Sequence, residues 1–276
     1  MHAAEITALR ISLAKAQFAN REQYACVPLG FEDADACLKG GLQRGALHEV
    51  FAETSHEAAA TGFTAALARR VCADRHLLWI RQNFSALEFG ELAATGLFEF
   101  GLNPARILFL HVSDAMEALR AGGDALSCAA RGAVVIEIPG NSKILDLVAS
   151  RRLTLACARN GVTGFLLRFA AKPDASAAET RWLVRAAPSC QVAARATGED
   201  CSPAEDENWG KPAFETRLLR NRHGQTGHWV MEWNCDNGLF REPGDKQAAN
   251  PGAVVSTPCD RPVATAMEGS ALRSVA

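Results

Sequence analysis

The sequence predicts an α/β fold with a mostly parallel central sheet. Three observations support this: strand-like and helix-like segments alternate, the strand-like segments are apolar almost throughout, and a last pair of strand-like segments flanks a short turn. Strands that are apolar on both sides are typical of a parallel sheet covered by helices on both faces. The predicted strands of the parallel part are residues 46–51, 76–80, 107–112, 133–138 and 163–169.

The composition limits the class of protein. The chain has 276 residues, 48% hydrophobic and 22% charged, which is ordinary for a globular protein with one large core or two modest ones. A net charge of -2 excludes a uniformly basic surface for nucleic acid. The cysteines form no C-x-x-C pair, which predicts reduced thiols, and no apolar run reaches membrane-spanning length. We therefore expect a cytoplasmic protein that does not enter the membrane.

Residues 1–22 are predicted to form an N-terminal helix. Their apolar side chains recur near the helical period of 3.6 residues, which gives a stripe that packs either on the same chain or on another subunit. The residues of this stripe are Ile6, Leu9, Leu13 and Phe18.

The strand 46–51 leads through a short loop into a predicted helix. A strand, a loop and a helix in this order are where nucleotide-binding proteins carry the phosphate-binding motif G-x-x-x-x-G-K-[ST]. The two glycines, the lysine and the hydroxyl residue of that motif are replaced here by Ala52, Glu57, Ala58 and Ala59.

These replacements remove what a bound phosphate requires. A left-handed backbone at Ala52 or Glu57 would cost roughly 1–2 kcal/mol each. The missing lysine removes a charged hydrogen bond worth about 1.5–3 kcal/mol, and Glu53 and Glu57 add like charge. A total above about 4 kcal/mol would weaken nucleotide binding about a thousandfold or more. We therefore predict no nucleotide cofactor and no ATPase activity.

Several longer segments carry a family resemblance. The run LGFEDADACLKGGLQRGALHEVFAE resembles the entrance to the ATPase core of RecA/KaiC-type proteins. Together with four later segments it resembles, more narrowly, the ImuA family of bacterial RecA-like proteins. Those segments are GAVVIEIPG, LVASRRLTLACARNGVTGFLLR, TRWLVRAAPS and RLLRNRHGQTGHWVMEWN. The resemblance implies a RecA-like core of the P-loop NTPase type over residues 23–240, with a degenerate phosphate loop.

Other positions that serve ATP hydrolysis in that fold are also altered. The strand 133–138 resembles a Walker B strand and carries Glu137, followed by a proline and a glycine. The strand 76–80 ends in Arg81 and Gln82, where recombinase-type ATPases place the acid that activates water. A simpler interpretation of Glu137 is a carboxylate at a strand end that pairs with an arginine, since a charge alone is weak evidence for a functional site.

Two helices complete the parallel part. The helix 114–128 is expected to begin with Ser113 as its N-cap. A second helix, 142–158, is expected to end at Asn160 and Gly161, a common C-terminal stop signal.

The last part of the chain has a different character. After a strand at 181–186, the polar and acidic stretch 191–212 is interpreted as a mobile insertion. The strands 214–221 and 228–233 are predicted to form a β-hairpin that extends the sheet at its edge. Residues 241–276 are predicted to be disordered, because Pro, Ala, Ser and Gly dominate there without periodicity.

The hairpin carries a candidate surface for a protein partner or DNA. Its residues are Arg217, Arg220, Arg222, Trp229 and Trp233. Arginines can contact phosphates while indole rings stack on bases or anchor a protein. The alternative is that the tryptophans fill the core face of the hairpin and the arginines its solvent face, which the alternation of residues along the strand favours.

No motif for catalysis or metal binding stands out. His223, His228 and Cys235 lie close in the sequence, but their spacing matches no zinc pattern, and we predict no metal. The sequence has no G-x-S-x-G and no H-E-x-x-H motif.

The resemblance implies a role in DNA-damage-induced (SOS) mutagenesis. The expected partners are the Y-family polymerase-like protein of the same gene cassette, the recombinase RecA and, through them, an error-prone C-family DNA polymerase. Two alternatives stay open: a divergent DNA-stimulated ATPase that holds nucleotide between subunits, and a SulA-like inhibitor of cell division. Direct DNA contact, through the hairpin or the loops 139–142 and 172–180, is also left open by these residues.

Overall fold

The computed structural model describes residues 25–189 and 210–243. The predicted N-terminal helix, nearly all of the acidic stretch and most of the C-terminal tail lie outside the described residues.

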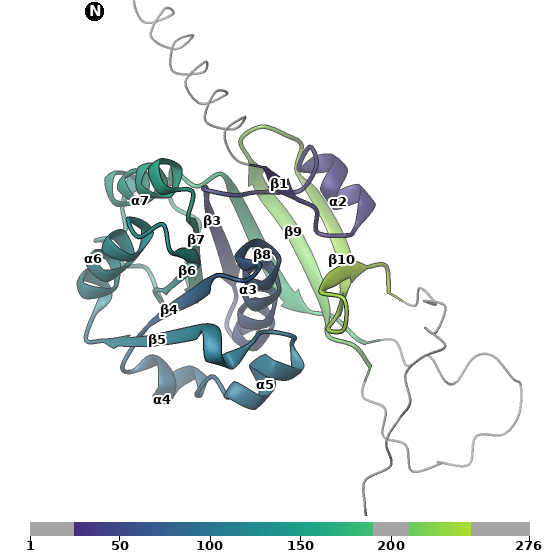
Figure 1. The fold of residues 1–276 in the computed structure, drawn as a ribbon, viewed down its shortest axis with the longest axis horizontal. Coiled ribbons are helices and arrows are strands. Elements are labelled where there is room, and N and C mark those ends of the chain that lie inside the picture. Colours follow the sequence, from purple (N-terminus) through teal and green to yellow (C-terminus); the bar gives the residue numbers. More distant parts are fainter. Residues whose placement is uncertain (1–24, 190–209, 244–276) are drawn as a thin grey trace, which may run out of the picture. The chain divides into compact units, whose positions relative to one another are not determined.

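Nine strands form one mixed sheet with β3 at its centre (Figure 1). The order of the strands across the sheet is β11-β10-β9-β8-β3-β7-β6-β4-β5. Their bounds are β3 (Leu47–Ala52), β4 (His76–Gln82), β5 (Ile107–Val112), β6 (Arg131–Glu137), β7 (Thr163–Phe169), β8 (Thr180–Ala186), β9 (Ala213–Asn221), β10 (Gly227–Asn234) and β11 (Leu239–Arg241). A separate pair, β1 (Cys26–Val27) and β2 (Leu42–Gln43), is antiparallel.

The direction of the strands changes at β8. The strands β5, β4, β6, β7, β3 and β8 pair in parallel, whereas β8, β9, β10 and β11 pair antiparallel to one another. The predicted parallel sheet with a C-terminal hairpin added to it is therefore confirmed. The short strands β1, β2 and β11 were not expected, because two or three residues are too few for a periodic pattern.

Helices cover both faces of the sheet. The bounds of the helices are α2 (Glu32–Cys37), α3 (Glu57–Cys72), α4 (Ser85–Phe89), α5 (Ala94–Glu99), the 3-10 helix η1 (Pro104–Arg106), α6 (Ala115–Leu126) and α7 (Leu147–Asn160). Each described helix is too short or too polar to cross a bilayer.

Each face of the sheet has its own core. The core under α3 is rich in aromatic side chains, among them Phe63, Trp182 and Trp233, whereas the core under α6 and α7 is aliphatic. Gly122 allows α6 to approach the sheet, because a Cβ there would lie 2.3 Å from the Cδ1 atom of Ile136. The two glycines of α6, costly for an isolated helix, thus include one that close packing requires.

The starts of two helices differ from the prediction. The N-cap of α6 is Asp114, whose carboxylate accepts a hydrogen bond from the Glu117 N–H, so the prediction of Ser113 was wrong. Helix α7 begins later than expected because Asp146 caps it, and it ends at Gly161 (φ 66°) as predicted. Aspartate accepts these hydrogen bonds as well as serine does, which is why the sequence alone did not decide between neighbours.

Candidate functional site

The position of the degenerate phosphate motif is a four-residue loop between β3 and α3. The strand ends at Ala52 and the helix begins at Glu57. Neither residue adopts a left-handed backbone; the loop residue with positive φ is Ser55 (φ 81°). The expected strain at Ala52 and Glu57 was therefore wrong, because both residues lie in regular secondary structure. The cost of a missing lysine and of like charge is unaffected by this correction.

Carboxylates of the chain itself accept hydrogen bonds from the polar groups around this loop. The Ser55 N–H donates to Oε1 of Glu57 at 3.1 Å. On the other side, Nη2 of Arg185 donates to Oε2 of Glu53 at 2.7 Å, in a half-exposed ion pair. A phosphate at this loop would meet two negative charges and would compete with Glu57 for a backbone donor.

The carboxylate of Glu137 is buried and paired with an arginine. Its Oε2 atom accepts hydrogen bonds from Nε of Arg81 at 3.0 Å and from Nε1 of Trp79 at 3.3 Å. The exposed fractions of the Arg81 and Glu137 side chains are 3% and 1%. The simpler interpretation of Glu137 is thus confirmed: Oε2 serves the ion pair with Arg81, while Oε1 is buried without a hydrogen-bond partner among the described residues.

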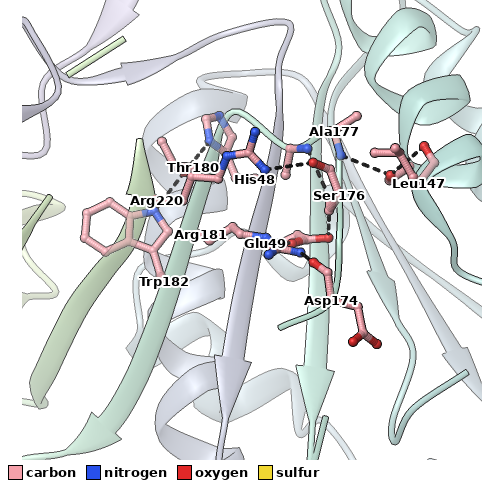
Figure 2. A network of polar contacts seen from close by, with 12 residues as sticks. His48, Glu49, Leu147, Asp174, Ser176, Ala177, Thr180, Arg181, Trp182 and Arg220 are labelled. Carbon is pink, nitrogen blue, oxygen red and sulfur yellow. Dashed lines mark hydrogen bonds and ion pairs between the residues drawn. The ribbon is translucent and has the colours of Figure 1, made fainter. Parts of the chain in front are cut away.

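A second buried network crosses the middle of the sheet (Figure 2). Glu49 on β3 accepts hydrogen bonds from Oγ of Ser176 at 2.8 Å and from Nε of Arg181 at 2.5 Å. Arg181 also donates to the backbone oxygen of Asp174, and Arg220 on β9 donates to that of Ser176 at 2.9 Å. The network thereby connects the loop before β8 to β3, β8 and β9.

Functional roles for Glu49, Arg181 and the buried Arg168 were not expected from the sequence. Nε of Arg168 donates to the backbone oxygen of Ile138 at 3.1 Å, and Nη2 to that of Gly140 at 3.0 Å. Burial lowers the pKa of Arg168, and the nearby charge of Glu49 opposes that shift. The sequence did contain a sign of their role: each of the three is a charged residue inside an apolar strand, where a charged side chain needs a partner.

His48 lies in the same region with its ring fully buried. Its Nδ1 lies 2.8 Å from Oγ1 of Thr180, and its Nε2 lies 2.9 Å from the backbone oxygen of Gln43. A carbonyl can only accept, so Nε2 carries the proton of the neutral ring. Burial lowers the pKa of His48 from 6.5 to about 4.

This shift predicts a loss of stability in mild acid. Below pH 6.5 the unfolded chain protonates His48 while the folded chain does not, so stability falls as the pH drops from 6.5 toward 4. Between pH 7 and pH 5 we expect a loss of about 2 kcal/mol from this residue alone. Urea unfolding at both pH values should show that loss for the natural protein and for the control His76→Gln, whose histidine is exposed. An equal loss in His48→Gln would contradict the assignment.

The arginines of the hairpin do not form one surface. Arg220 donates to the backbone oxygen of Ser176, and Nε of Arg222 to that of Ala178 at 3.1 Å, so both are half-buried. Burial lowers the pKa of Arg222, and the charge of Arg220 adds to that effect. Arg217 is exposed. Arg220 and Arg222 therefore hold the segment before β8 in place, which limits the expected arginine surface to Arg217.

The tryptophans of the hairpin face the core. Trp233 is fully buried, and its Nε1 atom donates to the backbone oxygen of Phe100 at 3.1 Å. Trp229 is half-buried, with its ring 6.2 Å from that of Trp182. Trp233 is therefore not available to a partner, which corrects its place in the candidate surface. The alternative, that the tryptophans fill the core face, is confirmed for Trp233.

The histidines of the hairpin lie beside carboxylates. Nε2 of His223 lies 3.4 Å from Oε1 of Glu179, and Nε2 of His228 lies 3.0 Å from Oε1 of Glu215. Within residues 25–189 and 210–243, no three His, Cys, Asp or Glu side chains gather as a metal site would need.

The outer edge of the sheet exposes apolar side chains. The strand β5 pairs with β4 on one side and is the last strand of the described sheet on the other. Its residues Leu108, Phe109 and Leu110 are 48%, 39% and 38% exposed, and Leu87 on the adjoining α4 segment is 89% exposed. A strand with one unpaired edge and exposed apolar side chains is typical of a protein-binding edge.

Comparison with known proteins agrees with the resemblance. No protein-family model matches the chain. The chain is 30% identical over 257 residues to Protein ImuA of Caulobacter vibrioides strain NA1000 / CB15N, and the alignment covers 87% of this chain and 93% of the relative. Protein ImuA of a second strain, ATCC 19089 / CIP 103742 / CB 15, matches with the same identity and coverage. The chain therefore belongs to the ImuA family.

Proposed function

We propose that the chain is a non-catalytic accessory protein with a RecA-like core that supports DNA-damage-induced translesion synthesis in the cytoplasm. Its proposed partners are the Y-family polymerase-like protein of the same cassette and the recombinase RecA. Through them it would bring an error-prone C-family polymerase to damaged DNA. Membership of the ImuA family supports the process, and the buried pairing of Glu137 with Arg81 is the observation that supports a non-catalytic role.

This site offers few of the groups that ATP hydrolysis requires. An ATPase needs donors around the phosphates and a carboxylate for Mg²⁺ or water. Here Glu57 accepts from a loop N–H, Glu53 is paired with Arg185, and Glu137 is paired with Arg81. These contacts favour a fold that keeps the strand–loop–helix geometry without the nucleotide.

The free edge of β5 supports a role in protein binding. Its apolar side chains and unpaired backbone groups fit a partner that adds a strand or packs an apolar face there. We propose this edge as the contact for the polymerase-like partner, since an exposed apolar strand is unfavourable for a protein that acts alone.

The double variant Leu108→Asp/Leu110→Asp is expected to lose most of its binding to the polymerase-like partner. Two carboxylates on the edge would remain charged in a contact that buries them, which costs well over a tenfold change in affinity. Co-purification of the two tagged proteins measures the loss. The matched control is Val148→Asp/Leu155→Asp, which changes two exposed apolar residues of α7 and should bind normally. Equal binding by all three proteins would remove β5 as the contact, and no binding by the natural protein would remove the proposed function.

A further inference from the structure

A hollow of about 410 Å³ lies at the amino-terminal edge of the sheet. It opens between the C-terminal end of α3 and the segment that joins α5 to β5, and the first residues of β4 and β5 form part of its wall. The loop between β3 and α3, at the position of the degenerate phosphate motif, follows the opposite, carboxyl-terminal end of β3. The hollow and this loop are therefore at different edges of the sheet. The volume of the hollow lies in the range of small-ligand sites.

Positive charge dominates the wall of this hollow. Its charged lining residues are Arg69, Arg75, Arg106 and Asp74. The carboxylate of Asp74 is fully exposed and 3.9 Å from Nη1 of Arg106, too far for a hydrogen bond. One solvated carboxylate therefore faces three guanidinium groups.

Two of these arginines have guanidinium N–H groups without an acceptor in the described part of the chain. Arg69 has a structural role, because it donates to the backbone oxygens of Phe100 and Cys235. The guanidinium groups of Arg75 and Arg106, by contrast, donate no hydrogen bond to any residue of 25–189 or 210–243, although the backbone N–H groups of both residues do. The dipole of α3 favours a cation beyond its C-terminal end, which accounts for the charge of Arg75 but not for its unused donors.

More positive charge lies around the hollow. Arg131 starts β6 opposite His76 of β4, and a Cβ on the following residue, Gly132, would lie 3.1 Å from the Cβ of Arg75. The charges of Arg44 and Arg75 both act on the thiol of Cys72, a lining residue. The Nε atoms of Arg44 and Arg131 are buried with no acceptor in the described part of the chain. Buried donors usually have a partner, and these two donors could serve an acceptor from outside the chain.

We propose that this arginine hollow, lined by Arg75 and Arg106, binds a terminal phosphate group, either of a free phosphate compound or at the end of a DNA strand. A phosphate monoester carries a charge of about -1.5 to -2 and three acceptor oxygens. A carboxylate offers one charge and two oxygens, and an internal phosphodiester one charge, so a monoester suits several guanidinium groups better. No aromatic side chain lines the hollow, which fits recognition of the phosphate rather than of a base.

The test compares two forms of one oligonucleotide on the full chain. A short oligothymidylate with fluorescein at its 3′ end is prepared with a 5′-phosphate or with a 5′-hydroxyl, and binding is followed by fluorescence anisotropy. We expect the phosphorylated form to bind about tenfold more tightly, and unlabelled pyrophosphate to compete. Arg75→Gln/Arg106→Gln should abolish that preference. The matched control Arg151→Gln/Arg152→Gln, which removes two exposed charges from α7, should keep it.

The other possible outcomes either assign the hollow to a different phosphate ligand or overturn the proposal. Pyrophosphate binding in calorimetry that needs Arg75 and Arg106, without any preference between the oligonucleotides, would assign the hollow to a free phosphate compound. Pyrophosphate and oligonucleotide binding that is absent, or unchanged in the double variant, would overturn the proposal. So would binding of a polyglutamate peptide in place of phosphate. Arg106→Gln, which alters a partly exposed side chain, serves if the double variant fails to fold. Partner capture is measured separately, so failure here leaves the proposed function standing.

Discussion

Replacing Glu137 by alanine is expected to destabilise the protein by about 3–5 kcal/mol, because it leaves the guanidinium group of Arg81 buried without its counter-ion. Both side chains are almost completely buried, and the same carboxylate also accepts from Trp79. Urea unfolding followed by tryptophan fluorescence measures the change. The expected result is a lower unfolding midpoint with an unchanged dependence on denaturant.

Two further variants separate the ion pair from other causes. Glu91→Ala removes an exposed carboxylate 3.5 Å from Arg81 and should cost less than about 1 kcal/mol. Arg81→Met/Glu137→Leu removes both buried charges and should recover most of the stability lost in Glu137→Ala. A loss below about 1 kcal/mol in Glu137→Ala would contradict this expectation, because it would show that Arg81 does not need Glu137 as its counter-ion.

The parallel part of the fold follows closely from the sequence. The strands β5 and β7 have the predicted bounds, and β3, β4 and β6 differ by one or two residues at their ends. Strands buried on both faces must be apolar throughout, and this requirement leaves a clear pattern in one sequence. The exposed apolar side chains of β5 carry the same pattern, so the sequence could not show that β5 is the edge strand.

Residues that depend on side-chain partners were harder to predict. The pairing of Glu137 with an arginine was expected, but its partner, Arg81, is 56 residues away and is identified only by the neighbouring positions of β4 and β6. Glu49 with Arg181, separated by 132 residues, follows the same rule. Strand order is set by long-range packing, which no local pattern records.

At the hairpin, the sequence suggested a binding surface for residues that instead make contacts within the chain. Arginine and tryptophan on adjacent strands are typical of interfaces, yet Trp233 is buried and Arg220 and Arg222 bind backbone oxygens within the chain. The alternation of Trp229, Met231 and Trp233 already favoured burial. Residue type suggested an interface, whereas the period-two pattern indicated the core face, and for Trp233 the pattern was the better guide.

Nucleotide binding is the second large effect, and we expect it to be lost. A working phosphate loop gives backbone donors, a lysine and a hydroxyl group to the phosphates and Mg²⁺. In this chain Ala58 and Ala59 offer neither side-chain group, and Glu57 takes the N–H of Ser55. The lost charged hydrogen bonds and the added negative charge weaken binding by more than about a thousandfold relative to an intact loop.

The most direct test of this non-catalytic account is a calorimetric titration of the full chain with MgATP. We expect no saturable heat at concentrations up to about 1 mM, with or without single-stranded DNA. A one-to-one transition with a dissociation constant in the micromolar range would contradict it.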